Sequence, residues 1–235
     1  MDYGSYISQI ANLMAADSTT PEFQTMVQGM IPYAEDRIYR ELDLLNTTVV
    51  NYANSFTAGS RSFTLPTNGA NGIFYTVTGI NVITPAGATP DAGTRNQMTA
   101  VTMDYLNAVW NSATGASVPQ EFAMVNQFTI VVGPWPDANY NVEVVGTIQP
   151  APLSSTNTTT FLTDYLQDLF VAASMIFASS FMRDFGAQSD NPQMAVSWES
   201  TYQTLLKSAM LLELRKKFAG PAWTPFSSIP ISPTR

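Results

Sequence analysis

The sequence predicts an α+β fold, in which N- and C-terminal helices form an antiparallel helical bundle around an inserted, mainly antiparallel β region. Apolar residues recur at helical spacing at both ends of the chain, and β-branched and aromatic segments separated by glycine-containing turns fill the middle. Residues 218–235 carry four prolines, which exclude a helix or a central strand there. We therefore expect three parts: a discontinuous helical bundle (1–46 and 153–217), a β-rich insert (47–152) and an extended proline-rich tail (218–235).

Two helices are expected at the N-terminus. Residues 5–15 carry apolar side chains at helical spacing, namely Ile7, Ile10, Leu13 and Met14. A second helix is expected from Thr20 to about residue 45, with Pro21 at its first position. Because the residue before a proline avoids the α region, Pro32 predicts a break in this helix.

The clearest helical pattern lies at residues 33–45. One stripe of this segment is apolar: Ala34, Ile38, Leu42 and Leu45. On its other side Asp36–Arg40 and Arg37–Glu41 are i,i+4 pairs, which we expect to be exposed to solvent. Each such pair contributes only about 0.2–0.5 kcal/mol, so burial of the apolar stripe must hold this helix in place.

The middle of the chain predicts strands and turns. Strands are expected at residues 47–53, 61–65 and 74–83, followed by a Pro- and Gly-containing loop at 84–97. A short helix is expected at 103–110, with Thr102 as its cap. Residues 128–132 and 140–148 are predicted to pair as a hairpin around 133–137.

Two long helices follow a polar linker at residues 154–160. The first is expected from 161 to 185 with Gly186 as its C-terminal cap, and the second from Pro192 to about 218. The last turn of the second helix carries Arg215, Lys216 and Lys217, which suit the negative end of a helix dipole.

The proline-rich tail carries large apolar groups that a solvated segment does not need. They are Trp223, Phe226, Ile229 and Ile231, and Pro225 stiffens the chain between the two aromatic residues. An extended segment with apolar anchors is typical of a strap that binds in a groove, and that groove can belong to another subunit.

The absence of histidine and cysteine limits the chemistry of the chain. It excludes Ser–His and Cys–His catalysis, and zinc sites built from imidazole or thiolate. We expect no cofactor and no metal. A glycosidase using paired carboxylates stays open as a minor alternative, with Asp104, Glu121, Asp137 and Glu143 as its candidate acids. The composition favours an assembly protein over an enzyme.

The net charge of −8 is uneven along the chain. Residues 1–150 hold 12 acidic and 4 basic side chains, whereas residues 151–235 hold 6 of each. Because affinity for DNA depends on Lys and Arg that neutralise phosphates, we expect no specific DNA binding. The chain begins without a signal-peptide pattern, and its most apolar segment (169–181) is shorter than the about 20 residues that span a bilayer, so no membrane association is expected.

One motif resembles a known family. The segment Tyr33-Ala34-Glu35-Asp36-Arg37-Ile38-Tyr39-Arg40-Glu41-Leu42 is similar to the "A-E-x-R-I-x-R-E-L" signature of the head-to-tail adaptor (connector) proteins of tailed bacteriophages. Three further features support the resemblance: Leu65-Pro66, Val118-Pro119, and the Pro-Trp-Pro-Asp-x-x-Tyr sequence that begins at Pro134.

The resemblance implies a structural virion protein of the short-tailed type, assembled in the host cytoplasm and located at the head–tail junction. Copies of such a protein form a closed ring, typically of twelve, between the portal protein above and the tail nozzle protein below, and DNA passes through the channel without specific binding. The helical part would pack side by side around the ring, and the tail, with Trp223 and Phe226 as anchors, would insert between portal subunits. Possible portal or subunit contacts are Arg37, Arg40, Glu41, Arg215, Lys216 and Lys217, which solvated helix faces explain equally well.

The alternative is a tail accessory or receptor-binding module whose β insert binds glycan. Exposed aromatic side chains on the insert would favour it, because aromatic faces stack on sugars; the candidates are Trp110, Trp135 and Tyr140.

Overall fold

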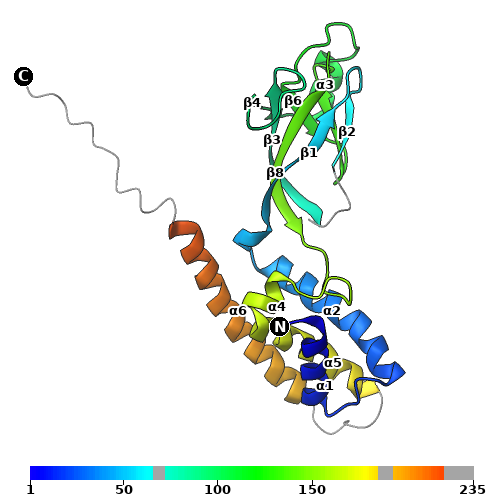
Figure 1. The fold of residues 1–235 in the computed structure, drawn as a ribbon, viewed down its shortest axis with the longest axis vertical. Helices are drawn as coiled ribbons and strands as arrows, with labels where there is room; N and C mark the ends of the chain where they lie inside the picture. The colour runs from blue at the N-terminus through cyan, green and yellow to red at the C-terminus, as the bar shows by residue number, and fades with distance from the viewer. Residues whose placement is uncertain (66–71, 185–192, 220–235) are drawn as a thin grey trace, which may run out of the picture. The chain divides into compact units, whose positions relative to one another are not determined.

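The computed structural model describes residues 1–65, 72–184 and 193–219, except for the side chains of 182–184, 193–195 and 218–219. The chain divides into two compact units: Met1–Leu45 with Pro152–Arg235, and Asn46–Ala151. The first unit is helical and the second is built of two mainly antiparallel sheets and a short α-helix, so the predicted α+β class is confirmed (Figure 1). The tail at 220–235 lies outside the described residues.

The helical unit is organised around one central helix. Its elements are α1 (Tyr3–Met14), α2 (Pro21–Glu41), α4 (Phe161–Tyr165), α5 (Gln167–Asp184) and α6 (Gln193–Ala219). Helix α5 contacts each of the other four helices of the unit. It suits this position because it is apolar on several sides and carries the small buried residues Ala172, Ala173 and Ser174, which allow close approach of its neighbours.

The first two helices begin with side-chain caps. The Oδ1 atom of Asp2 accepts a hydrogen bond of 2.7 Å from the backbone N–H of Ser5, so α1 starts two residues before the predicted start. The hydroxyl of Thr20 accepts from the N–H of Phe23, and Pro21 occupies the first turn of α2 as predicted.

Helix α2 differs from its prediction at two places. It continues without interruption through Pro32, which is exposed, so water can satisfy the carbonyl that loses its partner. It ends at Glu41 rather than near residue 45, because Leu42 adopts an extended conformation. In the extended segment Leu42 and Leu44 are buried, whereas Leu45, predicted to lie in the buried stripe, is 45% exposed.

The predicted helix at 161–185 is divided into α4 and α5 at Leu166. The hydroxyl of Thr160 caps α4, and the side chain of Thr163 bonds back to the N–H of Thr160. Leu166 then leaves the helical conformation with φ −130° and ψ 41°, and its side chain is buried. The predicted Gly186 cap lies outside the described residues, and α6 agrees with the predicted range within one residue.

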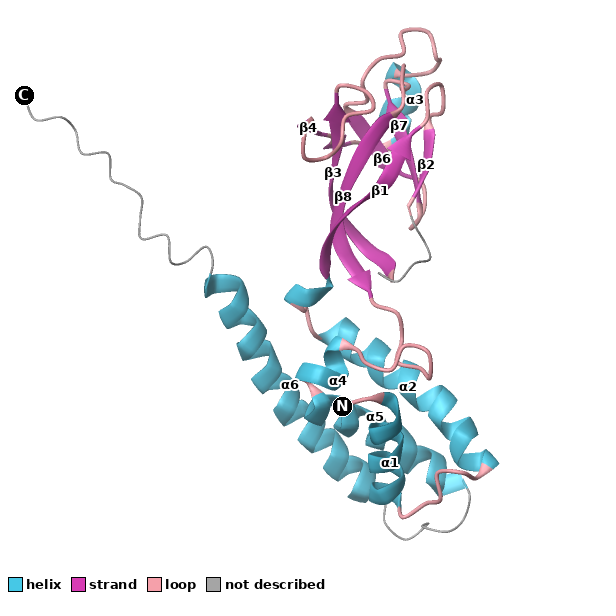
Figure 2. Cartoon of the chain, in the orientation of Figure 1, coloured by secondary structure: helices cyan, strands magenta, loops and turns pink. Residues whose placement is uncertain are grey.

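The β unit contains two four-stranded sheets. Its strands are β1 (Thr48–Phe56), β2 (Ser62–Thr64), β3 (Ile73–Thr84), β4 (Thr94–Gln97), β5 (Thr99–Ala100), β6 (Glu121–Met124), β7 (Thr129–Gly133) and β8 (Tyr140–Gln149). One sheet has the order β1-β8-β3-β4 and the other β2-β7-β6-β5. All pairs are antiparallel except β5 with β6. Figure 2 shows the long strands β1, β8 and β3 side by side.

The predicted hairpin of residues 128–132 and 140–148 is wrong. Both strands form, but β7 pairs with β2 and β6, whereas β8 pairs with β1 and β3 in the other sheet. Residues 134–139 therefore connect two sheets. The predicted loop at 84–97 also contains a strand, β4, which pairs with the end of β3.

The core of the β unit lies between its two sheets. The ring centroids of Phe56 on β1 and Phe63 on β2 are 5.1 Å apart in an edge-to-face arrangement. A second cluster forms where the short helix α3 (Met103–Val109) contacts β6 and β7. There Trp110 packs against Gly133, where a Cβ atom would lie 2.3 Å from the indole ring.

Candidate partner-binding surface

Helix α6 is buried along one part and exposed along the next. Tyr202, Leu206 and Ala209 are buried in the core of the helical unit. Among the described side chains from Met210 to Lys217, Glu213 alone is buried. The second half of α6 therefore presents most of its circumference to solvent.

This exposed half carries an apolar stripe formed by Met210, Leu211 and Leu214. Their side chains are between 43% and 58% exposed. Because successive helical residues are about 100° apart, the three side chains fall within about 100° of the helix circumference. Single exposed leucines are ordinary, but neighbouring exposed apolar side chains on one face of a helix make that face a candidate interaction surface. We refer to these three residues as the α6 apolar stripe.

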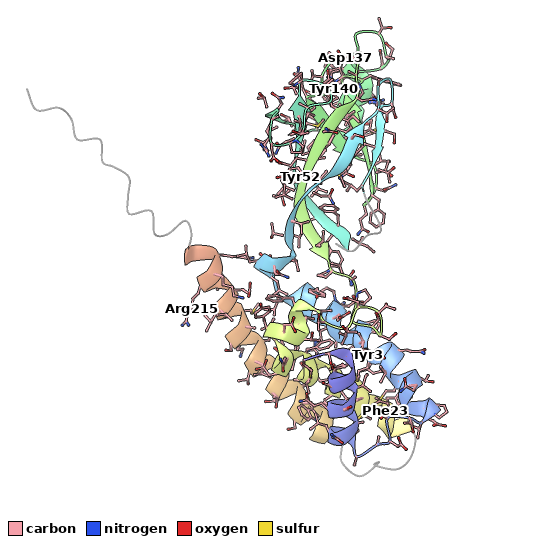
Figure 3. The ribbon with its side chains drawn as sticks, viewed as in Figure 1. Tyr3, Phe23, Tyr52, Asp137, Tyr140 and Arg215 are labelled. Carbon is pink, nitrogen blue, oxygen red and sulfur yellow. The ribbon has the colours of Figure 1, made fainter. Side chains whose placement is uncertain are left out.

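The basic residues of the last turns of α6 have different environments. Arg215 is exposed, and Figure 3 shows it projecting from α6 away from the helical unit. Lys216 Nζ lies 2.6 Å from Glu213 Oε1 and 5.4 Å from the centre of the Phe161 ring. Lys217 forms an ion pair with Asp43. Arg215 alone is therefore available to a partner without the loss of a contact within the described part of the chain.

Arg37 is largely covered rather than solvent-exposed, contrary to prediction, and Glu41 beside it is half-buried. Arg37 donates two hydrogen bonds, of 2.9 and 2.6 Å, to the carboxylate of Glu199 on α6, and its Nε lies 3.2 Å from Glu41. The guanidinium carbon is 4.2 Å from the ring centre of Tyr202, whose hydroxyl donates to Glu41. The Arg37 side chain is only 14% exposed, so this cluster joins α2 to α6 within the chain.

The same cluster sets the ionisation of its members. The hydrogen bonds from Arg37 hold the pKa of Glu199 below its ordinary value, and they raise the pKa of Arg37. Arg40 has another position: it is exposed, and its Nε donates to the backbone carbonyl of Asp36. Arg40 is thus the member of the predicted trio that remains open to a partner.

Two glutamates are buried in the helical unit, and no pattern in the sequence indicated it. Glu35 is 2% exposed and accepts a hydrogen bond of 3.0 Å from the backbone N–H of Leu153. Burial raises its pKa to about 7, and the charge of Asp36 acts in the same direction. Glu213 is 4% exposed and accepts a hydrogen bond of 3.0 Å from the backbone N–H of Leu45.

The aromatic residues proposed for glycan stacking are largely covered. Tyr140 is 5% exposed, and its hydroxyl donates a hydrogen bond to the carboxylate of Asp137. Figure 3 labels both residues. Trp110 is half-buried and donates from Nε1 to Glu121. The Nε1 atom of Trp135 is itself buried, with no hydrogen-bond partner in the described part of the chain. Tyr140 is thus buried, and Trp110 and Trp135 are each half-buried.

Three of the four candidate acids of the β unit accept hydrogen bonds from neighbouring side chains, namely Glu121, Asp137 and Glu143, and the fourth, Asp104, lies in the first turn of α3. Glu143 is 5% exposed and accepts hydrogen bonds from Asn81 (2.6 Å) and Arg95 (2.8 Å). Burial raises its pKa, but these hydrogen bonds outweigh burial, so the pKa lies below the ordinary value. A glycosidase acid needs a raised pKa, and Glu143 has the opposite shift. Among the described residues no three His, Cys, Asp or Glu side chains form a group that could hold a metal ion.

The predicted tail anchors lie outside the described residues; they are Trp223, Pro225, Phe226, Ile229 and Ile231. Sequence reasoning missed the α6 apolar stripe, although Met210, Leu211 and Leu214 follow helical spacing next to the basic cluster. A count of apolar residues around the helix could have found it, because apolar side chains continue along α6 beyond the buried residues Tyr202, Leu206 and Ala209.

The sequence model of the SU10 adaptor protein family matches residues 1–223. The chain belongs to the SU10 adaptor protein family. The match includes both units and extends into the proline-rich tail as far as Trp223. A comparison with curated proteins finds no match.

Membership of the SU10 adaptor family makes the chain a structural adaptor of phages, a class that is not known for enzymatic activity. An adaptor family implies binding to portal and tail components and a location at the head–tail junction of the virion. In the described ranges of the chain, no helix has both the length and the apolar character to cross a bilayer.

Proposed function

We propose that this SU10-family chain is a head-to-tail adaptor of a short-tailed phage, whose copies form a closed ring of twelve that joins the portal to the tail nozzle. The observation that carries the proposal is the family match over residues 1–223. The ring would surround the channel through which DNA passes, at the head–tail junction of a virion assembled in the host cytoplasm. A closed ring requires heterologous contacts, in which one face of a copy binds a different face of the next.

The portal-binding end of the chain is proposed to comprise the second half of α6 and the tail. The α6 apolar stripe and Arg215 are exposed and directly precede the tail in the sequence. The tail then supplies Trp223, Pro225, Phe226, Ile229 and Ile231 as apolar anchors. A partner that receives such a segment buries apolar surface at about 25 cal/mol per Å², and proline limits the entropy lost on binding.

The β unit is proposed to face the nozzle protein or a neighbouring subunit. Its low charge and the low charge of the chain, at 12% Asp, Glu, Lys and Arg, suit a protein whose surface is largely covered in an assembly. The acidic balance of residues 1–150 suits a channel wall that does not retain DNA. The glycan-binding alternative has no support from Trp110 and Tyr140, which are engaged within the chain.

The portal itself provides the test of this proposal. The full chain is mixed with the purified portal of the same phage, and the complex is examined by sedimentation and electron microscopy. We expect a ring of additional density at one end of the portal, coaxial with it. A portal that sediments alone in the presence of excess chain would contradict the proposal.

A matched pair of variants locates the contact. Leu211→Asp with Leu214→Asp places two charges in the α6 apolar stripe and is expected to lower portal affinity at least tenfold, since charges are costly in an apolar contact. Val196→Asp is the control, because Val196 is 69% exposed on the same helix but far from the stripe. Equal binding by both variants would exclude the stripe from the interface.

A further inference from the structure

The chain passes between its two units twice, and at each passage a backbone N–H is hydrogen-bonded to a buried glutamate. Leu45 is the last residue of the helical unit before the β unit, and Leu153 lies one residue after the chain returns. The backbone N–H of each donates a 3.0 Å hydrogen bond to a glutamate of the helical unit, Glu213 for Leu45 and Glu35 for Leu153. Both glutamates are almost completely buried.

A buried carboxylate is a costly way to satisfy one backbone N–H. Water would serve an exposed N–H equally well, and a charged side chain resists burial unless its oxygens are hydrogen-bonded. A carboxylate held in this manner fixes the position of its partner, because loss of either group leaves the other unpaired. We therefore regard Glu35 and Glu213 as positioning residues for the two passages.

The contact at Leu45 is reinforced from the last turns of α6. Glu213 Oε1 pairs with Lys216 while its Oε2 accepts from Leu45, and Lys217 pairs with Asp43, two residues before Leu45. Leu44, between these two contacts, is completely buried. Residues 43–45 are therefore held at three successive positions, at two of them by side chains of α6.

We propose that the last turns of α6 form a clamp on residues 43–45. The contacts of this clamp break and re-form together, so that the end of α6 and the first passage into the β unit move as one body. The clamp consists of Glu213 and Lys217, with Lys216 orienting Glu213. The consequence of the clamp rests on the proposed function. If the tail after residue 217 is anchored to a portal, the clamp connects that anchored end to residues 43–45, just before the chain enters the β unit. Such a connection would couple the two binding ends of an adaptor that joins two partners.

Backbone amide exchange, resolved by residue in the NMR spectrum of the free full chain, tests the clamp without a portal. Glu213→Ala removes the acceptor of the Leu45 N–H, and Lys217→Ala removes the pair with Asp43. We expect exchange to accelerate at Leu45 and in the last turn of α6 together, by about tenfold or more in Glu213→Ala, which removes the acceptor of a charged hydrogen bond, and by about two- to fivefold in Lys217→Ala, which removes an exposed ion pair. Arg215→Ala is the matched control, because it changes an exposed side chain of the same turn and should leave both sites unchanged.

The Leu153 amide separates a clamp from a general loss of stability. It is held by Glu35, so it should keep its exchange rate in Glu213→Ala and Lys217→Ala, whereas general destabilisation would accelerate Leu45 and Leu153 alike. Faster exchange in the last turn of α6 with an unchanged rate at Leu45 would overturn the proposal. If Glu213→Ala does not fold, Lys217→Ala, whose partner Asp43 is exposed, carries the same comparison. Failure of portal binding would contradict the proposed function, but it would not change what the amide-exchange comparison says about the clamp.

Discussion

Arg37 illustrates how a residue of a sequence motif acquires its role from a distant part of the chain. The local pair with Glu41 could be predicted from the i,i+4 spacing. The stronger contact, to both carboxylate oxygens of Glu199, joins residues 162 positions apart, and nothing local in the sequence indicates it. The sequence therefore predicted an ion pair but placed it on the wrong side of the helix.

Arg37→Ala is expected to destabilise the helical unit. The substitution removes the main partner of the Glu199 carboxylate and the stacking on Tyr202, and because Glu199 is 40% exposed, water partly replaces the lost contact, so the free energy of unfolding should fall by about 1–2 kcal/mol. Urea denaturation followed by circular dichroism measures the change. Arg40→Ala, on the exposed side of α2, should stay within about 0.5 kcal/mol of wild type. Equal losses for the two variants would contradict the role assigned to Arg37.

Glu35 predicts a pH dependence with a definite sign. Its pKa is about 7 in the folded chain and 4.5 for the ordinary carboxyl, so the folded state holds a proton that the unfolded state has released between these values. The contribution of Glu35 to stability is therefore full below about pH 4.5 and is lost as the pH rises through 7. Each unit of pKa difference corresponds to about 1.4 kcal/mol.

Glu35→Gln should remove this dependence. Glutamine keeps a carbonyl oxygen for the Leu153 N–H but carries no charge. The free energy of unfolding of Glu35→Gln should therefore fall less than that of wild type between pH 5 and pH 8, and the variant should be the more stable protein at pH 8. Urea denaturation at several pH values measures both quantities. The same slope in wild type and variant would show that another group is responsible.

At the scale of elements, strand positions were easier to predict than strand partners. Alternation and β-branched residues predicted β1, β3, β7 and β8 within a few residues at each end. The pairing of β7 with β8 was wrong, because sequence neighbours joined by a short turn pair by default and only the packing of two sheets against each other overrides this. Strand β4 was missed since Thr-Arg-Asn-Gln has no apolar alternation; its exposed side chains leave no pattern to read.

Two glycines in the β1-β8-β3-β4 sheet give a matched test of its packing. A Cβ atom at Gly146 on β8 would lie 2.2 Å from the backbone oxygen of Thr76, which cannot move without disturbing β3, whereas a Cβ atom at Gly79 meets nothing within 4 Å. Gly146→Ala is therefore expected to destabilise the β unit by about 3 kcal/mol, at the upper end for overpacking. Gly79→Ala should change stability by about 1 kcal/mol or less. Thermal unfolding followed by near-ultraviolet circular dichroism compares them, and similar melting temperatures would contradict the sheet arrangement.

At the scale of the whole molecule, the α+β class could be predicted because helical and strand periodicities occupy separate stretches of sequence. The resemblance noted at residues 33–42 agrees with the family match over 1–223. The α6 apolar stripe and the two buried glutamates could not be predicted with the same ease. Their roles depend on how far α6 extends past its neighbours and on which backbone groups meet it, both of which are set by tertiary packing.

Removal of the tail separates folding from attachment. Deletion of residues 221–235 leaves the described helices and strands intact, so the unfolding transition should change little. Loss of Trp223, Phe226, Ile229 and Ile231 should abolish binding to the portal, since a few apolar anchors dominate such contacts. Sedimentation of the truncated chain with the portal measures binding. Normal binding at an unchanged melting temperature would show that the tail is not the anchor.

The central claim, that this chain is a ring-forming adaptor on a portal, is tested most directly by mass. Light scattering is applied to the purified chain alone and then to the chain mixed with its portal. We predict a 25.6 kDa monomer in the free state and the addition of twelve copies to the portal, because the portal is proposed to be the template on which the ring closes. A portal whose mass does not change in the presence of excess chain would contradict the account.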